Sequence, residues 1–501
     1  MLIAINFFYS TQIKAETNLL YNTKRFLSNL NHLHDDKTTL SKLSIHTPSQ
    51  SIIKRGLLYS IKWKYKNIDN DTKINIFVTN NKTKDSCNKS NAVLKANVNI
   101  EERIWGVETS ELKYKLYYIC FNWKNRGKSF FKFSKQPFRI VGWHSILTEN
   151  DGNILKNNFN NLIFDKNNSP IIALTEKINN NKFKVILITK KQQKWSTIKI
   201  PKIYVQNPNW VSIEKSNNEN IYIIYRDNNK YIKIIKHNDK WTDLNNIKIG
   251  KALGDSIKNN FSIAFNKNNT PYIAYIEAET KKAKVKKLGS KNIWQDIGIS
   301  GYASDVAGYA KYISLAISST GIPCIAYQSQ ELNSKRAKMR CFLAKFWQDI
   351  NPTMPYISDE DASYISLAFN KNDIPFVAFR DEIFDNRITV IKLINGIWED
   401  VSSTGISNNP VSQISLSFDK TTEPWILHIT YANDNTRPIC KASAKKLINQ
   451  TWQEIGNEEI SNISVSNLSF ILDNFSNPYI AFNSDDSEEK FKIYRFSTKM
   501  N

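Results

Sequence analysis

Charged and aromatic side chains gather at two recurring points of this sequence: where one expected strand ends, and in the loop that leads into another. Aromatic rings stack on sugar rings, and carboxylates accept hydrogen bonds from hydroxyl groups. This combination favours a glycan ligand, and it also suits a protein loop. We therefore predict a ligand-binding face made by Arg226, Asp227, Glu277, Tyr302, Asp305, Tyr309, Asp359, Asp361, Arg380, Asp381 and Asp485.

A structural role for the same residues stays open. Each adjacent Arg–Asp pair could bridge neighbouring elements or tether its own loop. Tyr312 and Tyr364 stand in the same expected loops, beside the predicted residues, and could equally pack against the body of the fold.

No catalytic constellation accompanies these residues. The sequence contains no G-x-S-x-G, H-E-x-x-H or G-x-x-x-x-G-K-[ST] motif. The six histidines have no metal-ligand spacing with another His or Cys, except His32 and His34, which we interpret as surface residues. We predict no catalytic residue, no metal site and no cofactor. The alternative is a hydrolase or lyase acting on polysaccharide, with paired carboxylates near Glu277–Glu279 or Asp359–Asp361.

The elements that must position these residues belong to a repeat over the last 365 residues. A polar turn closes each unit's first hairpin, at Pro170, Asn220, Pro271, Pro323, Pro375, Pro424 and Pro478. The steps between these positions are 50, 51, 52, 52, 49 and 54 residues. Each unit contains two apolar strands around the turn, an alternating strand, and a strand that carries a tryptophan. Four short antiparallel strands repeated in this way predict a β-propeller.

The tryptophans indicate how the ring closes. Six units carry one each, at Trp195, Trp241, Trp294, Trp347, Trp398 and Trp452. The seventh unit ends without its own, whereas Trp143 lies 52 residues before Trp195 in a strand that precedes the first unit. We expect a strand near residues 137–147 to complete the last unit, giving a seven-bladed propeller over 137–501. The repeat resembles bacterial-type β-propeller units of the form SLA-D--G-PYVAY-D, a resemblance that implies a fold and no particular function.

Residues 43–136 follow a different pattern of short alternating strands about ten residues apart, which predicts a small β-sandwich. The motifs are Pro48 and Gly56, Tyr59 and Trp63, Trp105 and Val107, Tyr117 and Ile119, and a closing Ser134, Pro137, Phe138 and Ile140. They resemble the immunoglobulin-like domain of Ser/Thr-rich lipid-anchored fungal wall proteins and of bacterial surface proteins. The whole chain is thus expected to be all-β.

The N-terminus reads as a short secretory signal over residues 1–15, with an ordinary N-terminus as the alternative. A partly helical segment is expected over 16–42. We predict a non-catalytic protein, secreted or at the cell surface, that binds a glycan or a protein. An intracellular scaffold or effector is a further alternative.

The five cysteines are relevant to whether the protein resides in an oxidising or a reducing compartment. Cys87 and Cys120 fall in one expected domain, and Cys324 and Cys341 flank one expected hairpin, where they would face each other. Two disulfides and a free Cys440 would fit an oxidising compartment, and five reduced thiols are the alternative.

The net charge of +23 comes mostly from dispersed lysines. A nucleic-acid-binding protein concentrates its charge on one element or stripe, so we predict no specific nucleic-acid partner. Weak attraction to anionic surfaces is still expected. No apolar run approaches the ~18–20 residues of a membrane-spanning helix, so we predict no transmembrane segment.

Overall fold

The computed structural model separates into two compact units. One unit comprises residues 1–51, 58–107 and 117–138, and the other comprises 52–57, 108–116 and 139–501. The structure describes residues 42–46, 52–54, 58–80, 82–83, 87, 94–102, 104–108, 116–125, 128–147, 158–191, 194–244, 250–252, 260–298, 302–304, 309–331, 334–351, 353–419, 423–434, 437–456, 460, 464–484 and 491–497. The expected signal peptide and lead-in lie outside these residues, apart from Lys42.

The first unit contains two sheets. One has the order β1 (Lys42–His46), β3 (Leu58–Lys66) and β6 (Ile104–Glu108). In the other, β4 (Lys73–Thr79) pairs with β5 (Leu94–Asn99) and with β7 (Leu116–Asn125), and β7 pairs with β8 (Lys128–Phe133). The buried Trp63 of the first sheet packs edge-on against Phe121 of the second, with ring centroids 5.2 Å apart. A disulfide joins Cys87 to Cys120.

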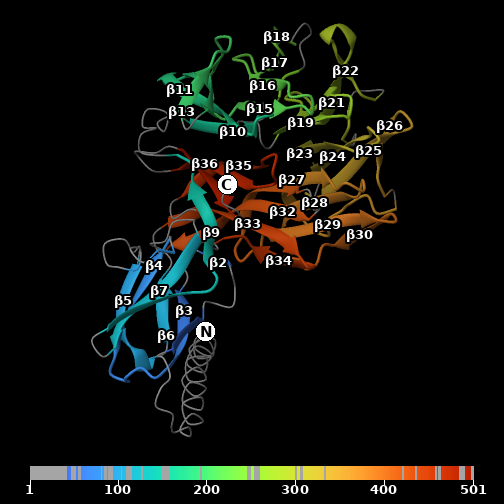
Figure 1. The fold of residues 1–501 in the computed structure, drawn as a ribbon. Coiled ribbons are helices and arrows are strands. Elements are labelled where there is room, and N and C mark those ends of the chain that lie inside the picture. Colours follow the sequence, from blue (N-terminus) through green and yellow to red (C-terminus); the bar gives the residue numbers. More distant parts are fainter. Residues whose placement is uncertain are drawn as a thin grey trace. The chain divides into compact units, whose positions relative to one another are not determined.

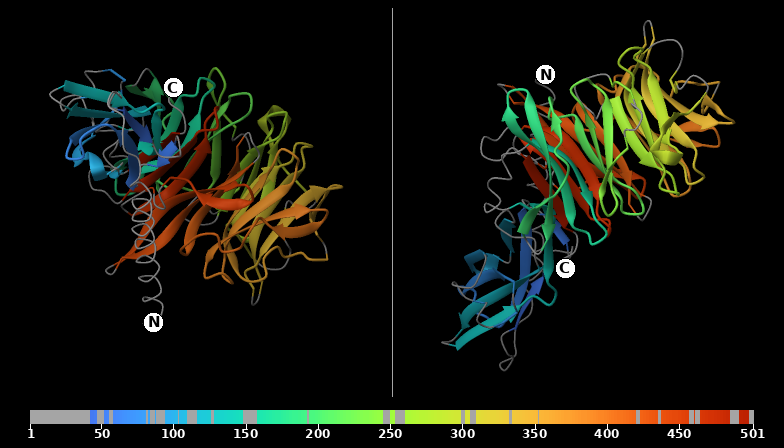
Figure 2. Two further views of the ribbon diagram at one scale, coloured as in Figure 1. Left: turned by 60° about the horizontal axis from the view of Figure 1, so that its bottom comes forward. Right: turned by 90° about the horizontal axis from the view of Figure 1, so that it is seen from above.

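In the part of the chain that the structure describes, the second unit contains seven groups of four successively paired strands, each called a sheet here (Figures 1 and 2). Sheet 1 contains β10 (Asn158–Phe164), β11 (Pro170–Asn179), β12 (Lys182–Lys191) and β13 (Lys194–Ile198), with β14 (Tyr204–Val205) also on β12. Sheet 2 contains β15 (Val211–Lys215), β16 (Ile221–Arg226), β17 (Ile232–His237) and β18 (Trp241–Asp243). Sheet 3 contains β19 (Phe261–Phe265), β20 (Pro271–Ile276), β21 (Ala283–Leu288) and β22 (Trp294–Asp296). The four main strands of each of these three sheets are paired in chain order.

The remaining sheets repeat this plan. Sheet 4 contains β23 (Tyr309–Ile317), β24 (Pro323–Gln330), β25 (Ala337–Leu343) and β26 (Phe346–Asp349). Sheet 5 contains β27 (Ala362–Phe369), β28 (Pro375–Asp381), β29 (Arg387–Ile394) and β30 (Ile397–Asp400). Sheet 6 contains β31 (Val411–Phe418), β32 (Pro424–Asp434), β33 (Arg437–Ile448) and β34 (Thr451–Glu454). Sheet 7 contains β35 (Val465–Leu472), β36 (Pro478–Ser484), β37 (Phe491–Ser497) and β9 (Phe138–Ser145), and β2 (Ile52–Lys54) pairs parallel with β9.

The turn between the first two strands of a sheet has the chemistry that the repeat predicts. In sheet 5 the Oδ1 atom of Asn370 accepts hydrogen bonds from the backbone N–H groups of Asn372 and Ile374, at 2.9 and 3.0 Å. Asp373 takes the left-handed conformation, with φ of 58°. Asn and Asp tolerate this conformation because their short polar side chains bond to the local backbone. Pro375 then begins β28, as the recurring proline predicted.

The strand that contains Trp143 completes the last sheet. β9 pairs antiparallel with β37, and Trp143 lies opposite Phe496. The Trp143 Nε1–H donates to the Ile455 carbonyl of sheet 6 at 2.7 Å. The equivalent indoles of Trp241, Trp294, Trp347 and Trp452 donate to carbonyls of the preceding sheet at 2.9–3.0 Å. Trp143 therefore holds the position of the repeated tryptophan that sheet 7 otherwise lacks.

One hydrophobic cluster fills the junction between each pair of successive sheets, and a further cluster joins the last sheet to the first. At that last junction the ring of Phe159 in β10 stacks on Phe491 in β37, with centroids 6.2 Å apart. Figures 1 and 2 show β35 and β36 in red beside the green β10. The described chain is all-β and propeller-like. A disulfide joins Cys324 to Cys341 across β24 and β25, and Cys440 is not part of a disulfide.

Candidate functional site

The first strands of the seven sheets, β10, β15, β19, β23, β27, β31 and β35, are here called the inner strands. In four of them a β-bulge lies at the same place in the repeat, and β10 has a further register shift between Phe159 and Asn161. At each bulge one residue is left-handed, with φ of 52° at Tyr312 and Tyr364, 51° at Gln413 and 54° at Asn467. A bulge redirects a side chain away from the regular alternation of a strand. The same local distortion therefore recurs in sheets 4 to 7.

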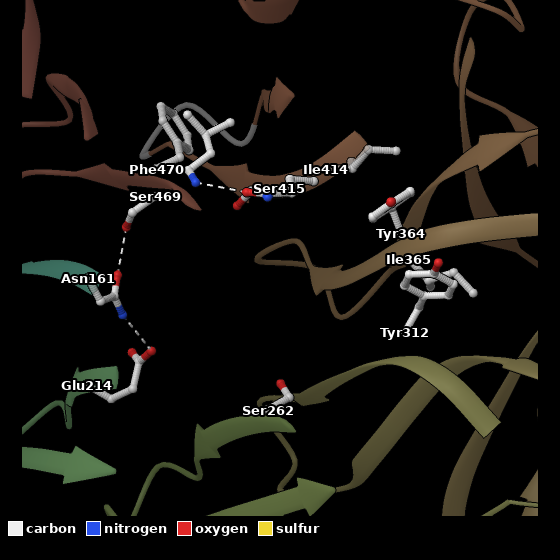
Figure 3. Close-up of a pocket in the computed structure, with 12 residues that line it drawn as sticks. Asn161, Glu214, Ser262, Tyr312, Tyr364, Ile365, Ile414, Ser415, Ser469 and Phe470 are labelled. Carbon is white, nitrogen blue, oxygen red and sulfur yellow. Dashed lines mark hydrogen bonds between the residues drawn. The ribbon is translucent and has the colours of Figure 1, made fainter. Parts of the chain in front are cut away.

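The inner strands surround a cavity of about 300 Å³, here called the central pocket (Figure 3). Every inner strand contributes at least one residue to its lining. The lining residues are Asn161, Glu214, Ser262, Tyr312, Tyr364, Ile365, Gln413, Ile414, Ser415, Leu468, Ser469 and Phe470. Three of the four left-handed bulge residues are among them, so the bulges help to shape the pocket.

Two tyrosines form an aromatic pair on one side of the pocket. The rings of Tyr312 and Tyr364 have centroids 4.8 Å apart and an interplanar angle of 48°. Both side chains are half-buried. The guanidinium carbon of Arg380 lies 5.8 Å from the Tyr364 ring centroid, and its Nε donates to Asn386 at 2.8 Å. The pair thus offers a supported aromatic surface.

Polar side chains occupy the other side, and Figure 3 shows Asn161 and Glu214 across the pocket from the tyrosines. The Asn161 Nδ2 donates to the Ser212 Oγ at 3.0 Å and to the Glu214 Oε1 at 3.3 Å. The Asn161 Oδ1 accepts from the Ser469 Oγ at 2.7 Å, which links sheet 7 to sheet 1. These bonds fix the orientation of the asparagine amide that faces the pocket.

Hydrogen bonds between inner strands also hold the rest of the lining in place. The Oγ atoms of Ser262, Ser314 and Ser366 each accept from a backbone N–H of the following inner strand at 3.0 Å. The Gln413 Oε1 accepts from the Leu468 N–H at 2.9 Å. The pocket is therefore built by the strands that form the fold rather than by loops.

Most of the sequence-predicted residues lie outside this lining, and several have structural partners. Glu277 accepts from Lys284 at 2.7 Å, from Thr280 at 2.7 Å and from Tyr302 at 3.3 Å. Burial raises the pKa of Glu277, but these hydrogen bonds and the charge of Lys284 outweigh it and leave the pKa below its usual value.

The same arrangement recurs one sheet later. Tyr356 donates to Glu331 at 2.6 Å, and Lys338 lies 3.1 Å from the same carboxylate. An arrangement that repeats in successive sheets has the character of a structural brace. The side chains of Glu277 and Tyr302 are engaged in such a brace.

The adjacent residues Arg226 and Asp227 also make contacts within the fold. The Arg226 guanidinium carbon lies 4.0 Å from the Trp210 ring centroid, and its Nη1 donates to the Ala252 carbonyl at 3.3 Å. The Asp227 Oδ1 accepts from the N–H groups of Asn229 and Tyr231 at 3.0 and 2.9 Å, which closes the β16–β17 turn.

The four predicted residues in or near sheet 5 lie in different environments. Asp381 is 4 % exposed, and burial, with smaller contributions from Asp359 and Asp400, raises its pKa. Asp359 is exposed. Asp361 accepts from the Lys335 backbone N–H at 2.6 Å. Arg380 contacts a lining residue of the pocket, Tyr364.

Three predicted residues remain. Tyr309 is half-exposed, with the Lys281 Nζ 4.6 Å from its ring centroid. Asp305 and Asp485 lie outside the described residues. Sequence reasoning did not select Asn161, Glu214 or Gln413. Their place in the repeat is the signal that could have found them: Gln413 precedes the recurring apolar–Ser–Leu pattern, Asn161 aligns with its serine, and Glu214 lies two residues after the equivalent serine.

Among the described residues, no group of three His, Cys, Asp or Glu side chains is placed to hold a metal ion. The same residues contain no helix long and apolar enough to cross a membrane.

No protein-family model matches the sequence, and no curated protein matches it either. Solved structures resemble the fold at low identity. An ulvan lyase bound to a GlcA–Rha3S oligosaccharide is 12 % identical, covers 69 % of this chain and 95 % of its own, and has a TM-score of 0.45. The Aleuria aurantia lectin, in complex with Fucα1-6GlcNAc, is 11 % identical, covers 57 % and 94 %, and has a TM-score of 0.39. A Dyadobacter fermentans protein of unknown function is 10 % identical, covers 71 % and 97 %, and has a TM-score of 0.40.

Proposed function

We propose that this chain is a non-catalytic glycan-binding protein, secreted or at the cell surface, whose central pocket holds one sugar unit. The observation that carries the proposal is the convergence of the Tyr312–Tyr364 pair with polar side chains from all the other inner strands. In this proposal the seven sheets are the blades of a β-propeller that β9 closes, and the first unit is an immunoglobulin-like module.

The chemistry of the pocket suits a sugar ring. One face of a pyranose is largely C–H and packs on aromatic rings, while its hydroxyls need donors and acceptors at its edge. Tyr312 and Tyr364 supply the aromatic surface, and Asn161, Glu214 and Gln413 supply amide and carboxylate groups. The volume of about 300 Å³ is at the low end of ligand pockets, which run from about 300 to 1,000 Å³. A single sugar unit is therefore the expected occupant, with the rest of a glycan outside.

Binding fits the pocket better than hydrolysis does. Glycoside hydrolysis ordinarily uses two carboxyl groups that flank the scissile bond, about 5–10 Å apart. Among the described residues that line the pocket, Glu214 is the one carboxylate. The pocket can therefore orient a sugar, but its described lining does not supply the pair of carboxyl groups that glycoside hydrolysis ordinarily uses.

The disulfides support an extracellular location. Cys87–Cys120 and Cys324–Cys341 each lie within one unit of the fold. Such bonds persist in oxidising compartments and are rare in reducing ones. The proposed location is therefore outside the cytoplasm.

A glycan array probed with the full chain, followed by calorimetry on the strongest ligand, tests the proposal. The decisive variant is Tyr364→Asn, because Asn467 already occupies the equivalent left-handed position in sheet 7. Loss of one aromatic contact of about 1–1.5 kcal/mol should weaken binding about tenfold. Tyr309→Asn is the matched control and should bind normally, because Tyr309 is in the same inner strand as Tyr312 but is not among the described lining residues.

Two outcomes would overturn the proposal. If Tyr309→Asn weakens binding and Tyr364→Asn does not, the ligand sits on the loops instead of in the pocket. If no glycan binds and a pull-down recovers a protein through the same pocket, the ligand class is wrong.

A further inference from the structure

The charge of the central pocket carries an inference about which sugars it accepts. The twelve lining residues include no Lys, Arg or His among those that the structure describes, and Glu214 is the one charged side chain. The chain as a whole has the opposite balance, with a net charge of +23. The pocket is therefore an acidic point within a basic protein.

We infer that the pocket selects neutral or ammonium-bearing sugars and rejects uronates and sulfated sugars, an inference that rests on the proposed function. Glu214 lies across the pocket from the tyrosine pair (Figure 3). A sugar ring stacked on Tyr312 and Tyr364 turns its edge substituents toward Glu214 and Asn161. A hydroxyl or ammonium group there donates to the carboxylate, whereas a carboxylate or sulfate group repels it.

Hydrogen bonds hold the carboxylate of Glu214 in position. Asn161 donates to its Oε1 atom at 3.3 Å and is itself fixed by Ser212 and Ser469. Arg380 contacts the lining residue Tyr364, but its guanidinium carbon lies 5.8 Å from the Tyr364 ring centroid and its Nε donates to Asn386. It is not part of the lining that the sugar would contact.

The dispersed lysines act over a different range. They attract anionic polymers to the outer surface, and salt screens that attraction within about 8 Å at physiological ionic strength. Contacts inside a half-enclosed pocket are screened much less. Raising the salt concentration should therefore weaken the attraction by the surface lysines more than it weakens the selection by Glu214.

The experiment is an array of neutral, amino, uronic and sulfated glycans, read at 0.15 M and about 0.5 M salt. Wild-type protein, Glu214→Gln and Glu219→Gln are compared. Glu219 is on the turn of the same hairpin, pairs with Lys215 at 2.9 Å and lies outside the pocket, so its variant makes the same charge change elsewhere. Tyr364→Asn identifies the signals that come from the pocket.

The expected result is that glycans retained at high salt are neutral or amino sugars and depend on Tyr364. Glu214→Gln should lower the preference for an amino sugar over its neutral parent, and raise binding of the matching uronate, each by about tenfold or more. Glu219→Gln should leave both ratios unchanged.

Salt-resistant, Tyr364-dependent binding of a uronate or sulfated sugar by the wild type would overturn the inference and leave the proposed function standing. Unchanged selectivity in Glu214→Gln would also overturn it. Glycan binding that does not respond to Tyr364→Asn would overturn the proposed function, and the inference with it.

Discussion

A buried histidine makes the stability of the second unit depend on pH in a calculable way. His428 lies in β32, is 1 % exposed and is opposite Ser443 in the β32–β33 register. Its Nδ1 meets no hydrogen-bond partner among the described residues. Burial, with a smaller contribution from the charge of Lys445, lowers the pKa of His428 to about 3 from the ordinary 6.5.

The sign of the effect follows from proton uptake. Between pH 6.5 and about 3 the unfolded chain binds a proton at His428 that the folded chain does not bind. The free energy of unfolding therefore falls as the pH falls through this window, and is highest above it. Between pH 7 and pH 5 this one residue should remove about 2 kcal/mol.

Urea denaturation at pH 7 and pH 5, followed by tryptophan fluorescence, measures this quantity. In His428→Gln the loss of stability between the two pH values should be smaller than in the wild type by about 2 kcal/mol. Ser443→Ala, which alters the same strand pair without a titrating group, should keep the wild-type difference. Equal pH dependence in the wild type and His428→Gln would refute the reasoning.

Three further predictions concern contacts between and within the sheets of the second unit. Trp143→Phe keeps a ring at the last junction but leaves a carbonyl without its donor, and should lower the free energy of unfolding by about 1–3 kcal/mol in thermal denaturation. Replacing Cys324 and Cys341 together by Ser should cost about 3 kcal/mol in urea, since the bond closes a loop with a sequence separation of 17. Gly456→Ala would place a Cβ 2.5 Å from the Trp143 ring at φ of +93°. It should therefore lower the melting temperature more than Gly396→Ala, which has φ of +79° and open space; an equal effect would contradict the packing described.

Much of the second unit could be predicted from its sequence because the pattern is repeated. Recurring turns, each closed by a proline or its equivalent, give the hairpins, and tryptophans about fifty residues apart give the outer strands. The position of Trp143 predicted its pairing with the last unit, and the structure contains that pairing. The repeated pattern makes this prediction possible because each sheet packs against its neighbours through the same kinds of contact.

The central pocket could not be predicted in the same way. Its shape depends on β-bulges, and a bulge changes hydrogen-bond register without leaving a clear mark on the hydrophobic pattern. The sequence pattern predicts that Tyr312 and Tyr364 lie in loops, but in the structure both lie within strands, at the β-bulges. Glu214 is a single acidic residue within an expected strand, so the sequence pattern alone does not mark it as a pocket residue. Charged residues at strand ends were easier to see, yet Glu277 and Asp227 bond within their own sheets.

The most direct test of the account is an experimental structure of the full chain with the strongest oligosaccharide ligand from the array. The account predicts one sugar ring packed on Tyr312 and Tyr364, with a hydroxyl or ammonium group within hydrogen-bond distance of Glu214. A ligand bound at the loops around Asp359 and Asp361, with the central pocket filled by solvent alone, would contradict it.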